Sequence, residues 1–281
     1  MWRSCLLINV GDNPDRPRPG RTWLRNLYHV HQRLWMAFPS NAQNDPQFLK
    51  PFNPRDFDAK QVKAKRDAET GFLFRIDPHP GGRVVIVVQS AAQPQWKYAF
   101  QNADFLLLDF LAAPPHAEEF DPSYHDGQQF RFRIRVALTN KKKTSTDGHD
   151  LRKYREAKDR YGRQKSQSKR VALSWEVKQD PQDVIRDWFS QKGKAGGFVV
   201  EVKDFRALQI GWGNGFRPGR KKTAEDGDDA GHHMRFRSAL LEGTLRVTNA
   251  DLFRNTIARG IGSGKAFGFG LLSVAPCAAA S

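Results

Sequence analysis

Cysteine is scarce in this sequence, with Cys5 and Cys277 the only two among 281 residues. Two thiols cannot form the four-ligand sites typical of structural zinc, and a reducing cytoplasm would keep them as thiols. Histidines do not replace them as metal ligands, because His29 and His31 project roughly 200° apart from one helix. The histidine pair at 232–233 has no third ligand at a suitable spacing. The sequence therefore predicts no disulfide, no metal site and no cofactor.

Long apolar runs are also missing, since none reaches the length of about 18 residues that a membrane-spanning helix needs. The segment Met1–Val10 has too short an apolar stretch for a secretory signal and no small-residue cleavage site. Basic residues are scattered and do not line one amphipathic helix, which argues against a membrane-surface role. We therefore expect a cytoplasmic protein that does not contact membranes.

Positive charge, by contrast, is abundant. The chain carries 46 Lys and Arg against 30 Asp and Glu, a formal net charge of +16, and a pI of about 10.1. Its apolar fraction of 39% is enough for a core, while a mean hydropathy of -0.66 indicates that much of the rest is solvated. Such a charge favours polyanionic partners, and nucleic acid is the first candidate.

One pattern of elements occurs twice along the chain. In the first pass, apolar residues at helical spacing predict an amphipathic helix that ends at Pro39. The turn sequence Pro-His-Pro-Gly-Gly joins two strands. The expected elements of this pass are a strand at 4–10, a helix at 24–38, strands at 71–76 and 83–89, a helix at 95–101 and a strand at 105–111.

In the second pass, phenylalanine, isoleucine and valine alternate with Arg131, Arg133 and Arg135, which predicts a half-buried strand with a cationic outer face. Asp180 followed by Pro181 is typical of a helix N-cap and first helical residue. The expected elements are strands at 129–138 and 170–175, a helix at 181–191, strands at 198–210 and 233–247, a helix at 249–259 and a strand at 267–274.

Two β-α-β-β-α-β units in series predict an α+β fold of two tandem ferredoxin-like domains, similar to the RNA-recognition motif. We place the first domain at 1–120 and the second at 127–281, with a basic insertion at 140–169 and a glycine-rich loop at 260–270. This scaffold can offer a sheet face and basic loops to RNA, although fold alone does not determine function.

Tyr28 and His31 are three residues apart on the first helix, so their side chains share a face. A histidine there can exchange protons near neutral pH, and a tyrosine hydroxyl beside it can orient a reacting oxygen. Both residues also lie on the apolar stripe of the helix, which is equally compatible with a role in core packing. Spacing alone leaves both interpretations open.

Glycines recur in the segment 259–274, where they let the backbone approach a ligand and let free N–H groups cradle a phosphate. A dinucleotide fingerprint would need the order strand then helix, which is reversed here, and a P-loop is excluded because Ala266 follows Lys265. The alternative is a helix C-cap followed by a tight turn.

Two basic tracts could contact phosphates. The insertion at 140–169 is too poor in apolar residues to order itself, and it suits nonspecific phosphate contact or is merely a solvated loop. The sequence Arg217-Pro-Gly-Arg220-Lys221-Lys222 is expected at the tip of a hairpin between two strands.

Four segments in this order resemble the CasE family, the CRISPR repeat endoribonucleases of type I-E Cascade. They are the helix 27–35 (Leu-Tyr-His-Val-His-Gln-Arg-Leu-Trp), the strand 130–135, the segment 169–173 and the glycine-rich ending 260–276. The resemblance spans nearly the whole chain. It implies tandem ferredoxin-like domains, a cut at the base of the repeat hairpin, and a product retained as a Cascade subunit, so the expected partners are CRISPR repeat RNA and other Cascade subunits.

Carried over by position, the resemblance implies that His31 is the catalytic histidine and Tyr28 its partner. The 2′-hydroxyl of the RNA would attack the phosphate without a metal, leaving a 2′,3′-cyclic phosphate and a 5′-hydroxyl. His31 would act as general acid or base, and Lys265 would stabilise charge on the phosphorane. The expected RNA-binding residues are Arg25, Arg33, Arg131, Arg133, Arg217, Arg220, Lys221, Lys222, Gly262 and Gly264.

Two departures from the family pattern concern the long connection at 140–169, which has no assigned role, and the residues Phe267 and Phe269, which stand where smaller residues are common and should alter packing. Two alternatives remain at this stage. One is a non-catalytic RNA-binding subunit with the same two domains, in which Tyr28 and His31 belong to the core. The other is a basic DNA-binding or ribosome-associated protein.

Overall fold

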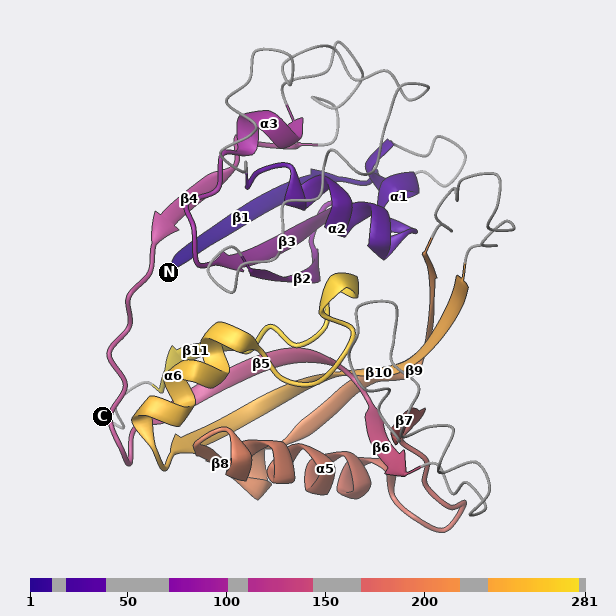
Figure 1. The fold of residues 1–281 in the computed structure, drawn as a ribbon, viewed down its shortest axis with the longest axis vertical. Coiled ribbons are helices and arrows are strands. Elements are labelled where there is room, and N and C mark those ends of the chain that lie inside the picture. Colours follow the sequence, from indigo (N-terminus) through magenta and orange to yellow (C-terminus); the bar gives the residue numbers. More distant parts are fainter. Residues whose placement is uncertain (12–18, 39–70, 101–110, 144–167, 218–231, 278–281) are drawn as a thin grey trace, which may run out of the picture.

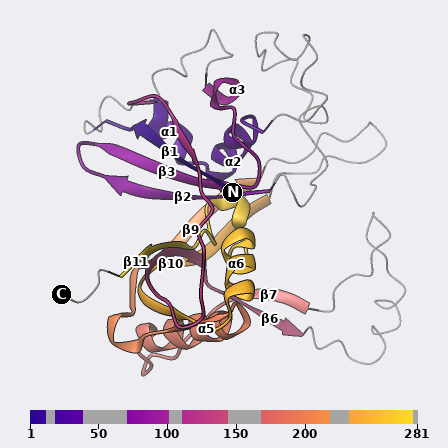
Figure 2. The ribbon, with the colours of Figure 1, turned by 90° about the vertical axis from the view of Figure 1, so that its left-hand side faces the viewer.

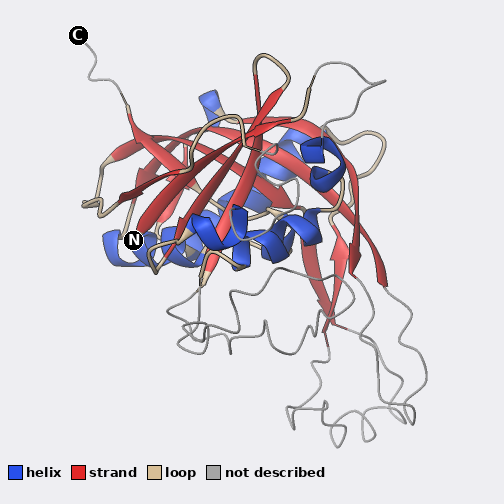
Figure 3. Ribbon diagram, turned by 90° about the horizontal axis from the view of Figure 1, so that it is seen from above, coloured by secondary structure: helices blue, strands red, loops and turns tan. Residues whose placement is uncertain are grey.

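The computed structural model describes residues 1–11, 19–38, 71–100, 111–143, 168–217 and 232–277, and the account that follows concerns those residues. The described chain forms two antiparallel sheets, one built from each half of the sequence. Figure 1 shows the two halves one above the other, joined at one side by the segment that runs from β4 to β5. Strands are more extensive than helices in this structure (Figure 3).

The first sheet has the strand order β2-β3-β1-β4, so its first strand lies between the third and the fourth. Its strands are β1 Trp2–Asn9, β2 Phe72–His79, β3 Arg83–Ser90 and β4 His116–Glu119. The segment 105–111 was expected to form the fourth strand, but β4 lies further along the chain. Of that segment, only Leu111 is among the described residues. That residue bridges to Ile8 on β1.

The helices of the first half are α1 Pro19–Leu24, α2 Leu27–Trp35 and α3 Trp96–Phe100. The single helix expected at 24–38 is therefore wrong, because the chain breaks between α1 and α2. The break has a local cause. Asn26 is extended and its side chain accepts a hydrogen bond from the backbone N–H of Tyr28 at 3.1 Å, which starts a new helix.

The second sheet has the order β11-β5-β10-β8, and β9 pairs with β10 beyond it. Its strands are β5 Gln129–Ala137, β8 Phe198–Val200, β9 Arg206–Arg217, β10 His232–Val247 and β11 Ser273–Pro276. β6 Thr139–Lys143 and β7 Ser168–Ala172 form a separate ribbon, which projects to one side in Figure 2.

Two strand predictions in this half are corrected. The segment 198–210 is not one strand, because the 3-10 turn η5 Val202–Asp204 separates β8 from β9. The segment 267–274 begins as the 3-10 turn η6 Lys265–Phe267, and β11 starts only at Ser273. Glycines in left-handed conformations at positions 264 and 268, with φ of 75° and 76°, bound that turn and interrupt an otherwise strand-like alternation.

Helices α5 Pro181–Ala195 and α6 Ala250–Arg259 both pack on the same face of the second sheet. Phe132 on β5 lies 5.4 Å from Phe189 of α5 between ring centroids, and Phe130 lies 6.1 Å from Phe253 of α6. With the first strand again between the third and fourth, this arrangement confirms the predicted α+β fold of two ferredoxin-like domains. The limits 1–120 and 127–281 stay a prediction.

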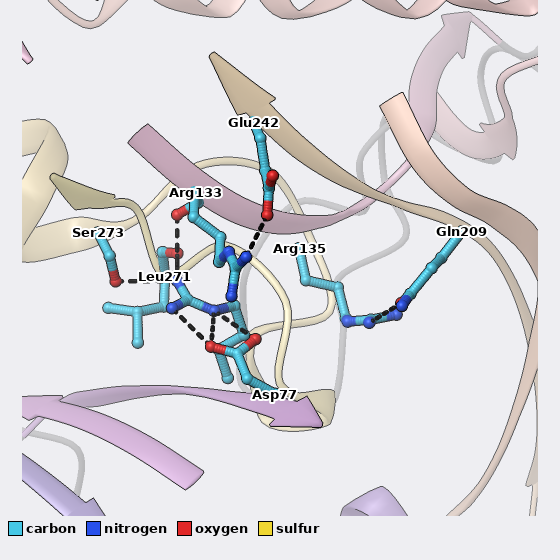
Figure 4. Close-up of polar contacts among 8 residues, drawn as sticks. Asp77, Arg133, Arg135, Gln209, Glu242, Leu271 and Ser273 are labelled. Atoms are coloured by element: carbon cyan, nitrogen blue, oxygen red, sulfur yellow. Dashed lines mark hydrogen bonds and ion pairs between the residues drawn. The ribbon is translucent and has the colours of Figure 1, made fainter. Parts of the chain in front are cut away.

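A buried ion pair joins the two halves. Arg75 on β2 donates through Nε to both carboxylate oxygens of Asp77, each at 2.9 Å. Its Nη1 donates to the carbonyl oxygens of Arg133 (3.0 Å) and Leu271 (3.3 Å) and to the hydroxyl of Ser273 (2.8 Å) in the second half. Figure 4 shows Asp77 on the lower strand facing these groups of the upper ones. The contact fixes β5 and the start of β11 against the first sheet.

A second buried contact acts on α6. The side-chain amide of Gln89 on β3 donates to the carbonyl oxygen of Ile257 at 2.7 Å. Ile257 lies in the last turn of α6, where carbonyl groups lack partners within the helix. The C-terminal end of α6, and with it the start of the glycine-rich loop, is therefore held by the first half of the chain.

Candidate functional site

The helix that carries Tyr28 and His31 lies where the two halves meet. Figure 1 shows η6 rising from the second half toward α2 and β2. The ring centroid of Tyr28 lies 6.0 Å from that of Phe267 on η6. Leu27 and Tyr28 pack against a small cluster formed by Ala137, Phe267 and Phe269. The structure thus brings the helix pair and the glycine-rich loop together.

Aromatic rings surround the imidazole of His31. It is stacked on Phe72 at 5.1 Å between centroids and on Phe74 at 6.2 Å, with interplanar angles of 25° and 22°. Trp35 meets it edge-on at 5.6 Å, and Tyr28 lies at 6.4 Å. The side chain is partly buried and not sealed in the core. These rings restrict the orientation of the imidazole, as an acid–base group requires.

Glycine is required in the loop for two different reasons. Gly260 ends α6 with φ of 69°, and its N–H donates to the carbonyl of Thr256 at 2.8 Å, so the C-cap interpretation holds at this position. At Gly268, also left-handed, a Cβ would lie 3.1 Å from the ring of Phe74. That close approach brings η6 directly against a ring that stacks on His31.

Gly262 and Gly264 are left-handed as well, with φ of 81° and 75°. Gly262 is exposed, while a Cβ on Gly264 would lie 2.8 Å from the ring of Phe269. The exposed backbone around Gly262 is therefore the part of the loop that a ligand can approach most closely.

Lys265 lies on η6, two residues from Phe267. Its ammonium donates a hydrogen bond to the carbonyl oxygen of Arg259, the last residue of α6. Burial lowers the pKa of Lys265, and the positive charges of Arg170 and Arg259 lower it further. In this structure the lysine caps a helix C-terminus, and reaching a phosphate would require it to exchange that acceptor.

The other predicted contacts do not gather at this site. Arg25 is exposed between α1 and α2. Arg33 turns toward α3, where it donates to the carbonyl of Ala99 at 3.4 Å, and burial lowers its pKa. Arg131 is exposed on β5, and Arg133 forms an ion pair with Glu242 at 2.5 Å.

The expected basic hairpin is described only in part. Arg217 ends β9, whereas Arg220, Lys221 and Lys222 lie outside the described residues. The same holds for the insertion at 140–169 apart from its two ends in β6 and β7. β9 and β10 pair along their length up to Arg217 and His232, so a hairpin stem at the expected place is confirmed.

Sequence reasoning missed the aromatic surroundings of the pair. Phe72 and Phe74 alternate on a strand, which places them on one face, but nothing local indicated that His31 would stack there. Phe236 on β10 adds to the site from another side, at 4.9 Å from Phe267 and 5.5 Å from Phe269 between centroids. The change in packing expected from Phe267 and Phe269, relative to the family, stays a prediction.

Among the described residues, no group of three or more His, Cys, Asp or Glu side chains is arranged to hold a metal ion. None of their helices is long and apolar enough to cross a membrane.

Fold and site together define a class of protein with two ferredoxin-like domains, in which helix α2 of the first domain packs against the glycine-rich turn η6 of the second. The sequence model of one family, described as CRISPR associated protein, matches residues 1–276. The chain belongs to this family, and the resemblance to its CasE members is confirmed.

Individual relatives agree with this assignment. The chain is 27% identical over 278 residues to the CRISPR-associated endoribonuclease Cse3 of Thermus thermophilus, covering 98% of this chain and 100% of the relative. A structure of CRISPR endoribonuclease Cse3 bound to a 19 nt RNA is 26% identical, with a TM-score of 0.59 and coverage of 98% and 100%. Cas6e of Escherichia coli K-12 is 20% identical, with a TM-score of 0.50 over 99% and 100% of the two chains, and shares the fold.

Proposed function

We propose that this chain is an endoribonuclease that cuts CRISPR repeat hairpins in precursor transcripts and keeps the product bound as a Cascade subunit. The observation that carries the proposal is the meeting of Tyr28 and His31 with the glycine-rich turn of the second domain. The full-length similarity to an endoribonuclease named Cse3 supports it. So does the likeness to a Cse3 structure that contains RNA.

The reaction uses a nucleophile that RNA itself supplies. The 2′-hydroxyl upstream of the cut loses its proton and attacks the adjacent phosphorus. The bond to the 5′-oxygen then breaks, and that oxygen gains a proton. The products are a 2′,3′-cyclic phosphate and a 5′-hydroxyl, and no metal-bound water takes part.

In this mechanism His31 gives or takes one of the two protons, a role worth roughly 10²–10⁴-fold in rate. Tyr28 orients the 2′-hydroxyl. Lys265 stabilises the charge on the phosphorane after exchanging the carbonyl of Arg259 for a phosphate oxygen. Holding the hairpin in a geometry ready for in-line attack supplies much of the remaining acceleration.

The hairpin would be gripped by cations on the β9–β10 ribbon and its tip. Because the major groove of A-form RNA is deep and narrow, recognition rests on shape, on phosphates and on unpaired bases. The basic residues proposed for this role are Arg217, Arg220, Lys221 and Lys222, with Arg25, Arg131 and Arg133 as further phosphate contacts. Arg33 is retained as the weakest member of this set because its guanidinium faces α3.

The test is a cleavage assay on a repeat hairpin from the source of this chain, run in EDTA and in magnesium. A single 2′-deoxy nucleotide upstream of the cut should abolish cleavage and leave binding intact. Cleavage that survives the deoxy substitution, or that requires magnesium, contradicts the mechanism.

The site is tested by His31→Ala, which should reduce the single-turnover rate roughly 10²–10⁴-fold with little change in affinity. His29→Ala is the matched control, since His29 is exposed on the same helix and turned away from His31. Tyr28→Phe should give a smaller loss in rate. The rings around His31 also suit a histidine with a purely structural role. If His31→Ala loses its fold as well as its activity, the non-catalytic RNA-binding subunit is favoured instead.

A further inference from the structure

An exposed tryptophan stands on the ribbon formed by β9 and β10. Trp212 on β9 is 47% exposed, a high value for a large aromatic side chain. Figure 1 shows the ribbon extending beyond the second sheet and rising beside the first half. Tryptophan, with its apolar ring and polar N–H, is enriched at interfaces, so its exposure on such an extension suits contact with another molecule.

Arginines flank this indole. The guanidinium of Arg235 lies 4.9 Å from the centroid of the Trp212 ring, and that of Arg237 lies 5.0 Å away. Arg237 also lies 3.9 Å over the ring of Trp175 and donates to the carbonyl of Leu173 at 2.8 Å. The four side chains alternate in the order Trp175, Arg237, Trp212, Arg235, which we call the Trp212 ladder.

A β-bulge explains why Trp212 joins the ladder. The pairing of β9 with β10 shifts register between Ser238 and Leu240, and Gln209 within the shift has φ of 49°. The extra residue brings Trp212 directly opposite Arg237. Bulges of this kind redirect side chains next to functional sites.

The ladder lies on the opposite face of the ribbon from the candidate site. Phe236 alternates with Arg235 and Arg237 along β10, and its ring packs against Phe267 and Phe269. One face of the ribbon therefore covers the glycine-rich turn, and the other presents an indole between two cations. A nucleic acid gripped by this ribbon can therefore reach the face that carries the ladder.

We propose that the Trp212 ladder binds an unpaired nucleotide that flanks the stem of the hairpin, an inference that rests on the proposed function. Arg235, which is exposed, moves from the indole to the phosphate, and the base stacks on the ring face that it leaves. Aromatic stacking beside a cation is the usual way in which proteins hold single-stranded RNA with little sequence preference. Arg237 is anchored to the carbonyl of Leu173 and keeps the indole in place.

The experiment compares three uncleavable repeat hairpins, each with a 2′-deoxy nucleotide at the cut. One is a bare stem-loop, one carries a 5′ single-stranded flank and one a 3′ flank, with 2-aminopurine in each flank. Affinities are measured for the wild type, Trp212→Ala, Trp212→Phe, Arg235→Gln and the control Arg254→Gln. Arg254 is exposed on α6, so Arg254→Gln removes one positive charge at a place away from the ladder.

We expect the wild type to bind one flanked hairpin about tenfold or more tightly than the bare one, with a change in 2-aminopurine fluorescence. Trp212→Ala should lose this gain and the fluorescence change while binding the bare hairpin normally. Trp212→Phe should lose less, and Arg235→Gln should lose more than Arg254→Gln.

Equal affinities of the wild type and Trp212→Ala for every flanked hairpin overturn the proposal. An equal loss on the bare hairpin overturns it too, because Trp212 would then support the ribbon or contact the stem. The proposed function fails separately, if the wild type does not cut the unmodified hairpin.

Discussion

Replacing Arg75 with methionine tests the contact that joins the two halves of the protein. The side chain of Arg75 is 5% exposed and that of Asp77 is 10% exposed, with Nη2 and a carboxylate oxygen 2.8 Å apart. Methionine has a similar length and no charge, so Arg75→Met removes the cation without leaving a large cavity. It leaves the carboxylate of Asp77 buried, and it removes a donor from the carbonyls of Arg133 and Leu271.

Breaking a buried ion pair by removing one partner typically destabilises a protein by about 3–5 kcal/mol. For a protein of this size, 1 kcal/mol shifts the melting temperature by about 2–4 °C, so we expect a decrease of about 6–20 °C. Replacing both partners, in Arg75→Met with Asp77→Leu, should recover part of this loss, because no buried charge then remains unpaired. The carbonyls of the second half would still lack their donor, so recovery should be incomplete.

The assay is equilibrium unfolding in urea, followed by circular dichroism and by tryptophan fluorescence. Tryptophans occur in both halves, and agreement between the two signals tests whether the halves unfold together. Arg83→Met is the control, since Arg83 is exposed on β3, and it should change the free energy of unfolding by no more than about 0.5 kcal/mol. An Arg75→Met protein that matches this control would refute the argument.

Two further predictions concern titrating groups. Because burial lowers the pKa of Lys265 below 10.5, the unfolded chain holds that proton more tightly. The free energy of unfolding of the wild type, relative to that of Lys265→Met, should therefore rise as the pH increases toward 10.5. Denaturation curves at alkaline pH measure it, and a difference between the two proteins that does not change with pH would contradict the burial of Lys265. Burial raises the pKa of Tyr124 to about 12, and among the described residues its buried hydroxyl has no hydrogen-bond partner. Tyr124→Phe should thus stabilise the fold by about 1 kcal/mol at neutral pH. As the pH rises from 10 toward 12, the wild type should lose stability through ionisation of this hydroxyl, and Tyr124→Phe should not. A lower melting temperature for Tyr124→Phe than for the wild type would mean that the hydroxyl has a hydrogen-bond partner.

The sequence predicted where a helix begins when a capping residue marks that position. Asp180 and Pro181 start α5 as expected, and Asn249 caps α6. The break at Asn26 was missed, because an N-cap inside a continuous apolar stripe gives no sign in the periodicity. The alternation of Phe267, Phe269 and Leu271 predicted a strand, and the left-handed glycines between them prevented it.

The site was predictable to the extent that it depends on one helix. Three-residue spacing placed Tyr28 and His31 on a common face, and the structure agrees. The two rings stacked on His31 come from β2, more than forty residues away in sequence. Such contacts depend on how the sheet packs against α2, which no local pattern specifies. The partners of Arg75, 58 and 196 residues away, were beyond prediction for the same reason.

The distance between α2 and the glycine-rich turn therefore depends on the contacts between the halves as well as on the turn itself. Gln89 holds the end of α6 and Arg75 holds the carbonyl of Leu271, so the first sheet fixes the loop on both sides of η6. Left-handed glycines then set the path of the chain between these two anchors. It follows that Arg75→Met should slow cleavage by more than it weakens hairpin binding, because the ribbon of β9 and β10 has its own support in the second sheet. Equal losses in rate and affinity would mean that the loop keeps its position without the anchor.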